Sequence, residues 1–212
     1  VLLALATIAS AGTPLALPSR ADRPATDTID DLAIVTDGLN AKIGSYPPSL
    51  SSEQDRRETY AKWADTLKRT WSATHKAPDS EASLWVLSEL YRQGHNLDVA
   101  ETDHLADETI QKCLALYPNS IHCHFSAAYF YLSIDPKYAP RGEASLLRLR
   151  ELLKPKVDAN VEKGLVFAYL YEGRKEDARK QVDYYLTLDP KSDWALKFKD
   201  ALDKGKLELR HE

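Results

Sequence analysis

Apolar residues recur every three or four positions through most of the chain, which is the spacing of one face of an α-helix. The clearest stripes are formed by Leu84, Leu87, Leu90 and Tyr91 and by Leu165, Ala168 and Tyr169. No part of the chain has the pattern of a strand-rich domain. Because each amphipathic helix must bury its apolar stripe against a neighbour, the pattern predicts an all-α fold of packed helices.

The same spacing predicts two helices nearer the start of the chain, over residues 26–43 and 52–75. The first contains Ile29, Leu32, Ile34 and Val35, and the second contains Tyr60, Trp63, Leu67 and Trp71. Between them lies the sequence Gly-Ser-Tyr-Pro-Pro-Ser, and a Pro-Pro pair cannot continue a helix. We therefore interpret residues 22–78 as an N-terminal helical hairpin.

Three segments later in the chain end alike. Leu114–Pro118 and Leu186–Pro190 share the pattern Leu-x-Leu-x-Pro, and Glu151–Pro155 is a looser copy. The closing prolines are 37 and 35 residues apart. Before both the first and the last proline, an alanine stands twelve residues back and a branched aliphatic residue stands eight residues back. The spacing of these two positions is repeated along with the Leu-x-Leu-x-Pro pattern, which indicates an internal repeat.

This spacing resembles the tetratricopeptide repeat (TPR), a helix-turn-helix unit of about 34 residues. The last copy matches the repeat best, through Leu165, Tyr169, Gly173, Ala178, Val182 and Pro190. The first copy has extra residues between its two halves, and the middle copy departs from the repeat at Asp135–Pro140. The resemblance implies an α-solenoid of TPR-like antiparallel helix pairs, preceded by the divergent hairpin.

A solenoid requires a cap at its open end. Residues 193–206 are predicted to form a capping helix, with Trp194 and Phe198 covering the last repeat, and residues 207–212 form a tail. Ser120 and Ser192 are expected to cap the helices that follow them. The TPR-like repeats and the capping helix together span residues 79–206.

In this family the first helix of each pair lines a concave surface, and the resemblance carries that role to ten positions. They are Trp85, Glu89 and Arg92 in the first copy, His122, Phe125 and Tyr129 in the second, and Asn160, Lys163, Phe167 and Tyr171 in the third. Aromatic and arginine side chains are typical interface anchors. We expect Arg92, Lys163 and Tyr171 to be exposed, whereas Trp85 and Phe125 fit a buried core equally well.

The first residues have the shape of an export signal. Val1–Leu17 is apolar, and Pro18 then precedes Ser19-Arg20-Ala21. Residues 1–21 are interpreted as a signal peptide clipped at its start and cleaved after Ala21, with Ala9-Ser10-Ala11 as a second cleavage site. An uncleaved anchor and a buried N-terminal helix are alternatives that the prolines of this stretch disfavour. The mature protein is then periplasmic or extracellular and does not span a membrane.

The chain has two cysteines, Cys113 and Cys123, at equal distances from Pro118. In an antiparallel hairpin they lie at similar heights, and an oxidising compartment lets a disulfide persist. Two buried thiols are the alternative. A metal site with His122 and His124 is disfavoured, because consecutive helical residues point about 100° apart.

Other chemistry is weakly indicated. The formal net charge is −4, and the sequence has no basic stripe that could neutralise a phosphate backbone. Both observations argue against nucleic acid as a partner. The usual nucleophile, phosphate-loop and zinc motifs are absent, and no cofactor is expected. We expect a non-enzymatic protein-protein interaction scaffold of the bacterial cell envelope that binds a partner peptide or helix. A periplasmic small-molecule binding and delivery component and a hydrolase with an unrecognised site remain open, as do the partner's identity and the oligomeric state.

Overall fold

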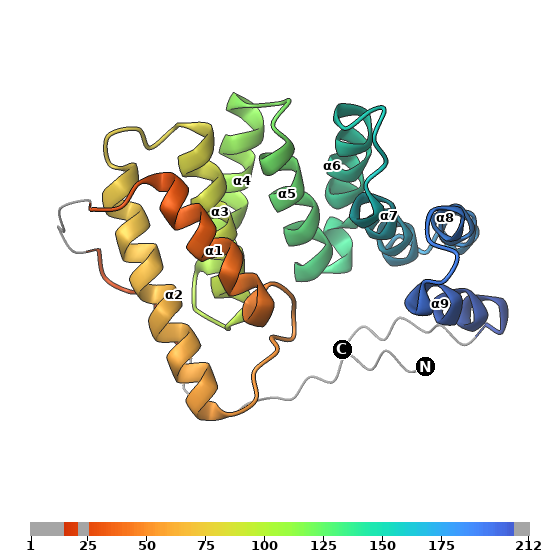
Figure 1. Cartoon of the computed structure of the whole chain (residues 1–212), viewed down its shortest axis with the longest axis horizontal. Helices are drawn as coiled ribbons and strands as arrows, with labels where there is room; N and C mark the ends of the chain where they lie inside the picture. Colours follow the sequence, from red (N-terminus) through yellow and green to blue (C-terminus); the bar gives the residue numbers. More distant parts are fainter. Residues whose placement is uncertain (1–14, 21–25, 206–212) are drawn as a thin grey trace. The chain divides into compact units, whose positions relative to one another are not determined.

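The computed structural model describes residues 15–20 and 26–205, and these residues form an all-helical structure, which confirms the all-α part of the predicted fold class (Figure 1). Within these ranges the extended pairing is limited to one bridge, between Leu15 and Val99. The helices are α1 Ile29–Ile43, α2 Glu53–Thr74, α3 Glu81–Asn96, α4 Thr102–Leu116, α5 Ile121–Ile134, α6 Ala139–Leu152, α7 Ala159–Tyr171, α8 Lys175–Leu188 and α9 Asp193–Asp203, with a short 3-10 helix, η1, at Pro136–Tyr138. Of the expected signal peptide only residues 15–20 are described; its remainder and the expected tail, 207–212, lie outside the described residues.

The described residues fall into two compact units that divide inside α5, between Ser126 and Ala127. The N-terminal unit contains α1 to α4 and the first part of α5. The C-terminal unit contains the rest of α5, η1 and α6 to α9.

In the N-terminal unit, α1 begins with a capping box in which the Thr28 side chain and the Asp31 side chain each bond the other's backbone N–H. The buried face of α1 consists of Leu32, Thr36, Leu39 and Ile43. Ile34, which the sequence pattern grouped with the apolar residues of this helix, lies off that face and is 73% exposed. The expected loop between the first two helices is present, and α2 starts at the N-cap Ser52.

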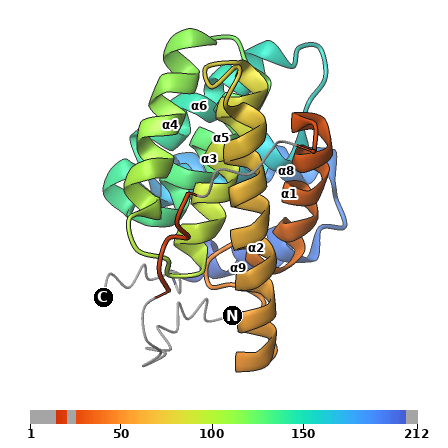
Figure 2. The same cartoon turned by 90° about the vertical axis from the view of Figure 1, so that its left-hand side faces the viewer.

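The core of the N-terminal unit is built around Trp63 of α2, which is fully buried. Its indole N–H donates to the carbonyl oxygen of Leu90 on α3, 2.7 Å away. Gly94 on α3 lets the helices approach, since a Cβ at this position would lie 2.6 Å from Trp63 Cζ2. Figure 2 shows α2 alongside α1 and α3, and each of these helices contacts the other two.

In the C-terminal unit each helix from α6 to α9 packs against the next. Gly173, with a φ of 74°, makes the turn between α7 and α8, and Ala178 at the start of α8 is fully buried. Trp194 and Phe198 of α9 pack on a core made of Val166, Leu170, Ala178, Val182, Tyr185, Ala195 and Leu202. The close approach of α7 and α8 therefore depends on small residues at the turn and at the contact.

Of the two expected serine caps, one forms. The Ser120 hydroxyl accepts the backbone N–H of Cys123 at 3.0 Å, as an N-cap does. Ser192 is the N-cap residue of α9 as predicted, but its side chain makes no capping hydrogen bond.

Candidate functional site

Trp85, Glu89 and Arg92 lie on one face of α3, as their spacing predicts, but this face is covered. Glu89 is 8% exposed and Arg92 is 4% exposed. The expectation that Arg92 is exposed is therefore wrong. The reason is that the end of α1 packs on α3 at this point, which the repeat pattern does not encode.

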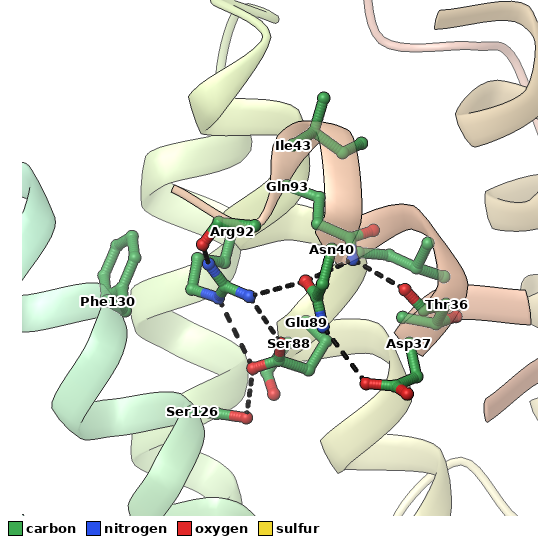
Figure 3. A network of polar contacts seen from close by, with 12 residues as sticks. Thr36, Asp37, Asn40, Ile43, Ser88, Glu89, Arg92, Gln93, Ser126 and Phe130 are labelled. Atoms are coloured by element: carbon green, nitrogen blue, oxygen red, sulfur yellow. Dashed lines mark hydrogen bonds and ion pairs between the residues drawn. The ribbon is translucent and has the colours of Figure 1, made fainter. Parts of the chain in front are cut away.

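Arg92 lies at the centre of a buried polar network (Figure 3). Its Nη1 donates to the Gly44 carbonyl oxygen at 2.6 Å, and its Nη2 donates to Asn40 Oδ1 at 3.0 Å and to Glu89 Oε2 at 2.7 Å. The Ser126 hydroxyl of α5 donates to Glu89 Oε1 at 2.6 Å. The network therefore ties together the end of α1, the middle of α3 and the first part of α5.

Two amides of α3 extend the network along α1. Gln93 Nε2 donates to the Thr36 carbonyl oxygen at 2.8 Å and to Asn40 Oδ1 at 2.9 Å. Asn96 Nδ2 donates to the carbonyl oxygen of Ile43, the last residue of α1, at 2.9 Å. The last carbonyl groups of a helix have no partner within that helix. Here α3 side chains satisfy carbonyl groups at the end of α1, which fixes where α1 docks.

The groups around Glu89 stabilise the ionised form of its carboxylate. Burial by itself would raise the pKa of this carboxyl, but the charge of Arg92 and the hydrogen bonds from Arg92 and Ser126 outweigh burial, so the pKa lies below its ordinary value. A buried charge is tolerated when it is paired and hydrogen-bonded, as this one is. Both carboxylate oxygens accept hydrogen bonds from the protein, so the arrangement suits a structural tie between helices.

The second-copy residues are distributed over both units. His122 is exposed and its ring centroid lies 4.4 Å from that of Trp85, which is half-buried. Phe125 is half-buried in the N-terminal unit, and Tyr129, in the C-terminal unit, is 45% exposed. The sequence left open whether Trp85 and Phe125 are buried or exposed, and the structure shows both side chains half-buried.

Cys113 and Cys123 are joined by a disulfide between α4 and α5, with their Cα atoms 5.7 Å apart. Both residues are fully buried, and Leu84 of α3 packs against them. His124 Nε2 lies 3.0 Å from the Pro118 carbonyl oxygen. Across residues 15–20 and 26–205, no group of three His, Cys, Asp or Glu side chains is arranged to hold a metal ion.

The third-copy residues follow one another along α7 and form the most open part of the predicted set. Asn160 is exposed at the start of the helix, and Lys163, Phe167 and Tyr171 are half-buried along it. Lys163 and Tyr171, expected to be exposed, are therefore only partly so. Burial raises the pKa of the Tyr171 hydroxyl.

Trp194 of α9 joins these side chains. The Phe167 and Trp194 rings are stacked with centroids 6.0 Å apart, and the Lys163 ammonium group lies 5.0 Å from the Trp194 ring centroid. Phe167 and Tyr171 have ring centroids 6.5 Å apart. We name Lys163, Phe167, Tyr171 and Trp194 the α7–α9 aromatic surface. Its chemistry combines apolar area, one hydroxyl and one cation.

The C-terminal unit also contains a charged tie that the sequence did not indicate. Arg150 of α6 donates to Glu162 of α7 through Nε at 3.0 Å and through Nη2 at 2.5 Å. Gln181 of α8 accepts from Arg150 and donates to the Glu162 carboxylate at 2.7 Å. Three helices meet at one carboxylate whose side chain is 2% exposed.

A second cluster surrounds Arg174 at the turn between α7 and α8. Its Nη1 donates to Glu143 of α6 at 2.9 Å and to Glu172 at 3.0 Å, and its guanidinium lies 4.4 Å from the Tyr169 ring centroid. Burial raises the pKa of the Glu172 carboxyl and the nearby Glu143 adds to this, although Arg174 lowers it. In sequence these charges look like an ordinary solvated helix face, so no pattern distinguished them.

Comparison of the chain with protein-family models, with curated proteins and with solved structures gave no match. No helix within the described ranges is long and apolar enough to cross a membrane.

Proposed function

We propose that this protein is a non-enzymatic interaction scaffold of the bacterial cell envelope, built as a TPR-like α-solenoid, and that it binds a peptide or helix of another protein. The observation that carries the proposal is the α7–α9 aromatic surface. Half-buried aromatic rings beside a cation supply contact area together with polar contacts, which is the composition of interface anchors.

The agreement of the last repeat copy with its expected helix pair supports the TPR-like interpretation. Gly173 stands at the turn, and Ala178 and Val182 are fully buried on the second helix, where the repeat needs residues that pack against its first helix. Pro190 follows the end of α8, and α9 packs on the pair as a capping helix does.

Two features support export. The sequence of residues 1–17 is apolar, as in a leader peptide. Both cysteines are used in one disulfide, a bond that persists in oxidising compartments. Together the two features support a periplasmic or extracellular location.

The proposal is tested by capturing partners from an envelope extract with Lys163→Glu and Lys180→Glu variants beside the unchanged protein. Both substitutions change the charge equally, but Lys163 lies over Trp194, whereas Lys180 is an exposed residue of α8. We expect Lys163→Glu to weaken capture of a specific protein at least tenfold and Lys180→Glu to leave it unchanged. Equal capture by both variants would count against the aromatic surface, and a bound small molecule without a protein would favour the ligand-delivery alternative.

A further inference from the structure

Residues 15–20 lie in extended form on the N-terminal unit, although the sequence assigned them to a leader that is removed. Leu15 pairs in parallel with Val99, which lies between α3 and α4. The Ala100 backbone N–H donates to the Leu15 carbonyl oxygen at 3.1 Å. The segment thus takes up a backbone donor that the loop would otherwise leave for water.

Two aromatic residues of α2 hold the rest of the segment. The Tyr60 hydroxyl donates to the Ala16 carbonyl oxygen at 2.6 Å, and the Arg20 guanidinium lies 5.0 Å from the Trp71 ring centroid. Eleven residues of helix rise about 16 Å, and four residues of extended chain reach about 13 Å. The spacing of Tyr60 and Trp71 therefore matches a segment that runs along α2.

The side chains of the segment follow the same arrangement. Leu15, Leu17 and Pro18 are partly buried, while Ser19 and Arg20 are exposed. A backbone bridge, a hydroxyl bond, apolar contact and a cation over an indole are four separate interactions. Cleavage after Ala21 would remove all of them and would expose the faces of Tyr60 and Trp71.

We propose that Tyr60, Trp71 and the Val99–Ala100 backbone form a binding site for an extended chain segment, and that its occupant is residues 15–20 of the same chain, retained in the mature protein. Where the leader is cleaved, the Ala9-Ser10-Ala11 motif then sets the cut and Gly12 begins the mature chain. This processing step rests on the export part of the proposed function.

The N-terminus of the protein isolated from the cells that make it tests retention directly. We expect an intact mass that starts at Gly12. A start further upstream also leaves residues 15–20 in place and supports retention, while arguing against export with cleavage. A start at Asp22 would overturn the proposal and leave export itself standing, so the two failures can be told apart.

A second measurement tests the site itself. Tyr60→Phe removes the hydroxyl bond to Ala16 and keeps the ring, and Tyr184→Phe, at an exposed tyrosine of α8, is the matched control. Loss of one hydrogen bond should increase the equilibrium population in which residues 15–20 are detached from the N-terminal unit by about 2- to 12-fold. Hydrogen exchange at the Ala100 amide should accelerate by that factor in Tyr60→Phe and stay unchanged in Tyr184→Phe. An unchanged rate in both variants would overturn the site.

Discussion

The Arg92 guanidinium lies 2.7 Å from the Glu89 carboxylate through Nη2 and 2.6 Å from the Gly44 carbonyl oxygen through Nη1. One side chain of α3 therefore neutralises a buried charge on its own helix and also holds the residue that follows α1. This contact explains how the end of α1 is attached to the middle of α3.

Replacing Arg92 by Met should destabilise the N-terminal unit by about 3–5 kcal/mol, because Glu89 would remain buried without its cation. The free energy of unfolding in urea measures the loss. The double variant Glu89→Leu/Arg92→Met is the control, since neither charge is left alone in it. A double variant that loses as much as the two single variants combined would show that the pair is not coupled.

Glu89 also predicts a pH dependence. Its pKa in the folded protein lies below the ordinary value of 4.5, so the stabilisation it provides is complete above that value and is lost as the pH falls through the lower, folded pKa. The difference in unfolding free energy between the unchanged protein and Glu89→Gln should shrink with acidification below about pH 4.5. Glu176→Gln, at an exposed carboxylate of α8, serves as the control.

The disulfide between Cys113 and Cys123 closes a loop whose ends are 10 residues apart in sequence. Loop-closure entropy for a loop of this length corresponds to about 2–3 kcal/mol of stability. Reduction should lower the urea midpoint by the corresponding amount, and the non-reduced protein should be two hydrogens lighter by mass. The variant with alanine at both positions should not respond to reductant; two free thiols in protein from an oxidising compartment would contradict the bond.

Gly94 should not tolerate a side chain. A Cβ there would lie 2.6 Å from Trp63 Cζ2 and 2.8 Å from Thr102 Cγ2, so Gly94→Ala should cost about 1–3 kcal/mol through overpacking. Gly38→Ala is the matched control, because Gly38 is an exposed helical position with nothing within 4 Å of an added Cβ. That variant should gain about 0.5–1 kcal/mol. Thermal melting of the two variants distinguishes the effects by their sign.

The sequence predicted the helices well, because helix periodicity and end signals are local properties of the chain. The expected ranges 26–43 and 52–75 contain α1 and α2, and the start expected for the last helix is that of α9. The fully buried Ala178 and Val182 occupy positions that the repeat phase had picked out. Patterns of this kind depend on residues close in sequence, so they can be read before the fold is known.

The site was less predictable, because its burial depends on contacts between distant segments. The resemblance selected Glu89 and Arg92, but Arg92 bonds Asn40 of α1 and Gly44, the residue that follows α1, and both lie outside any repeat copy. The tie between Arg150 and Glu162 was missed for the same reason. A charged residue on an amphipathic helix looks solvated in sequence until the helix that covers it is known.

Glu162 has a mechanical consequence for the C-terminal unit. Its carboxylate receives hydrogen bonds from Arg150 on α6 and Gln181 on α8. Moving α7 away from α6 would leave the buried charge without its cation, and moving α7 away from α8 would break the hydrogen bond from Gln181. A force applied to one of these three helices is passed to the other two at this carboxylate. The three helices should therefore yield together as one element, without peeling away one at a time.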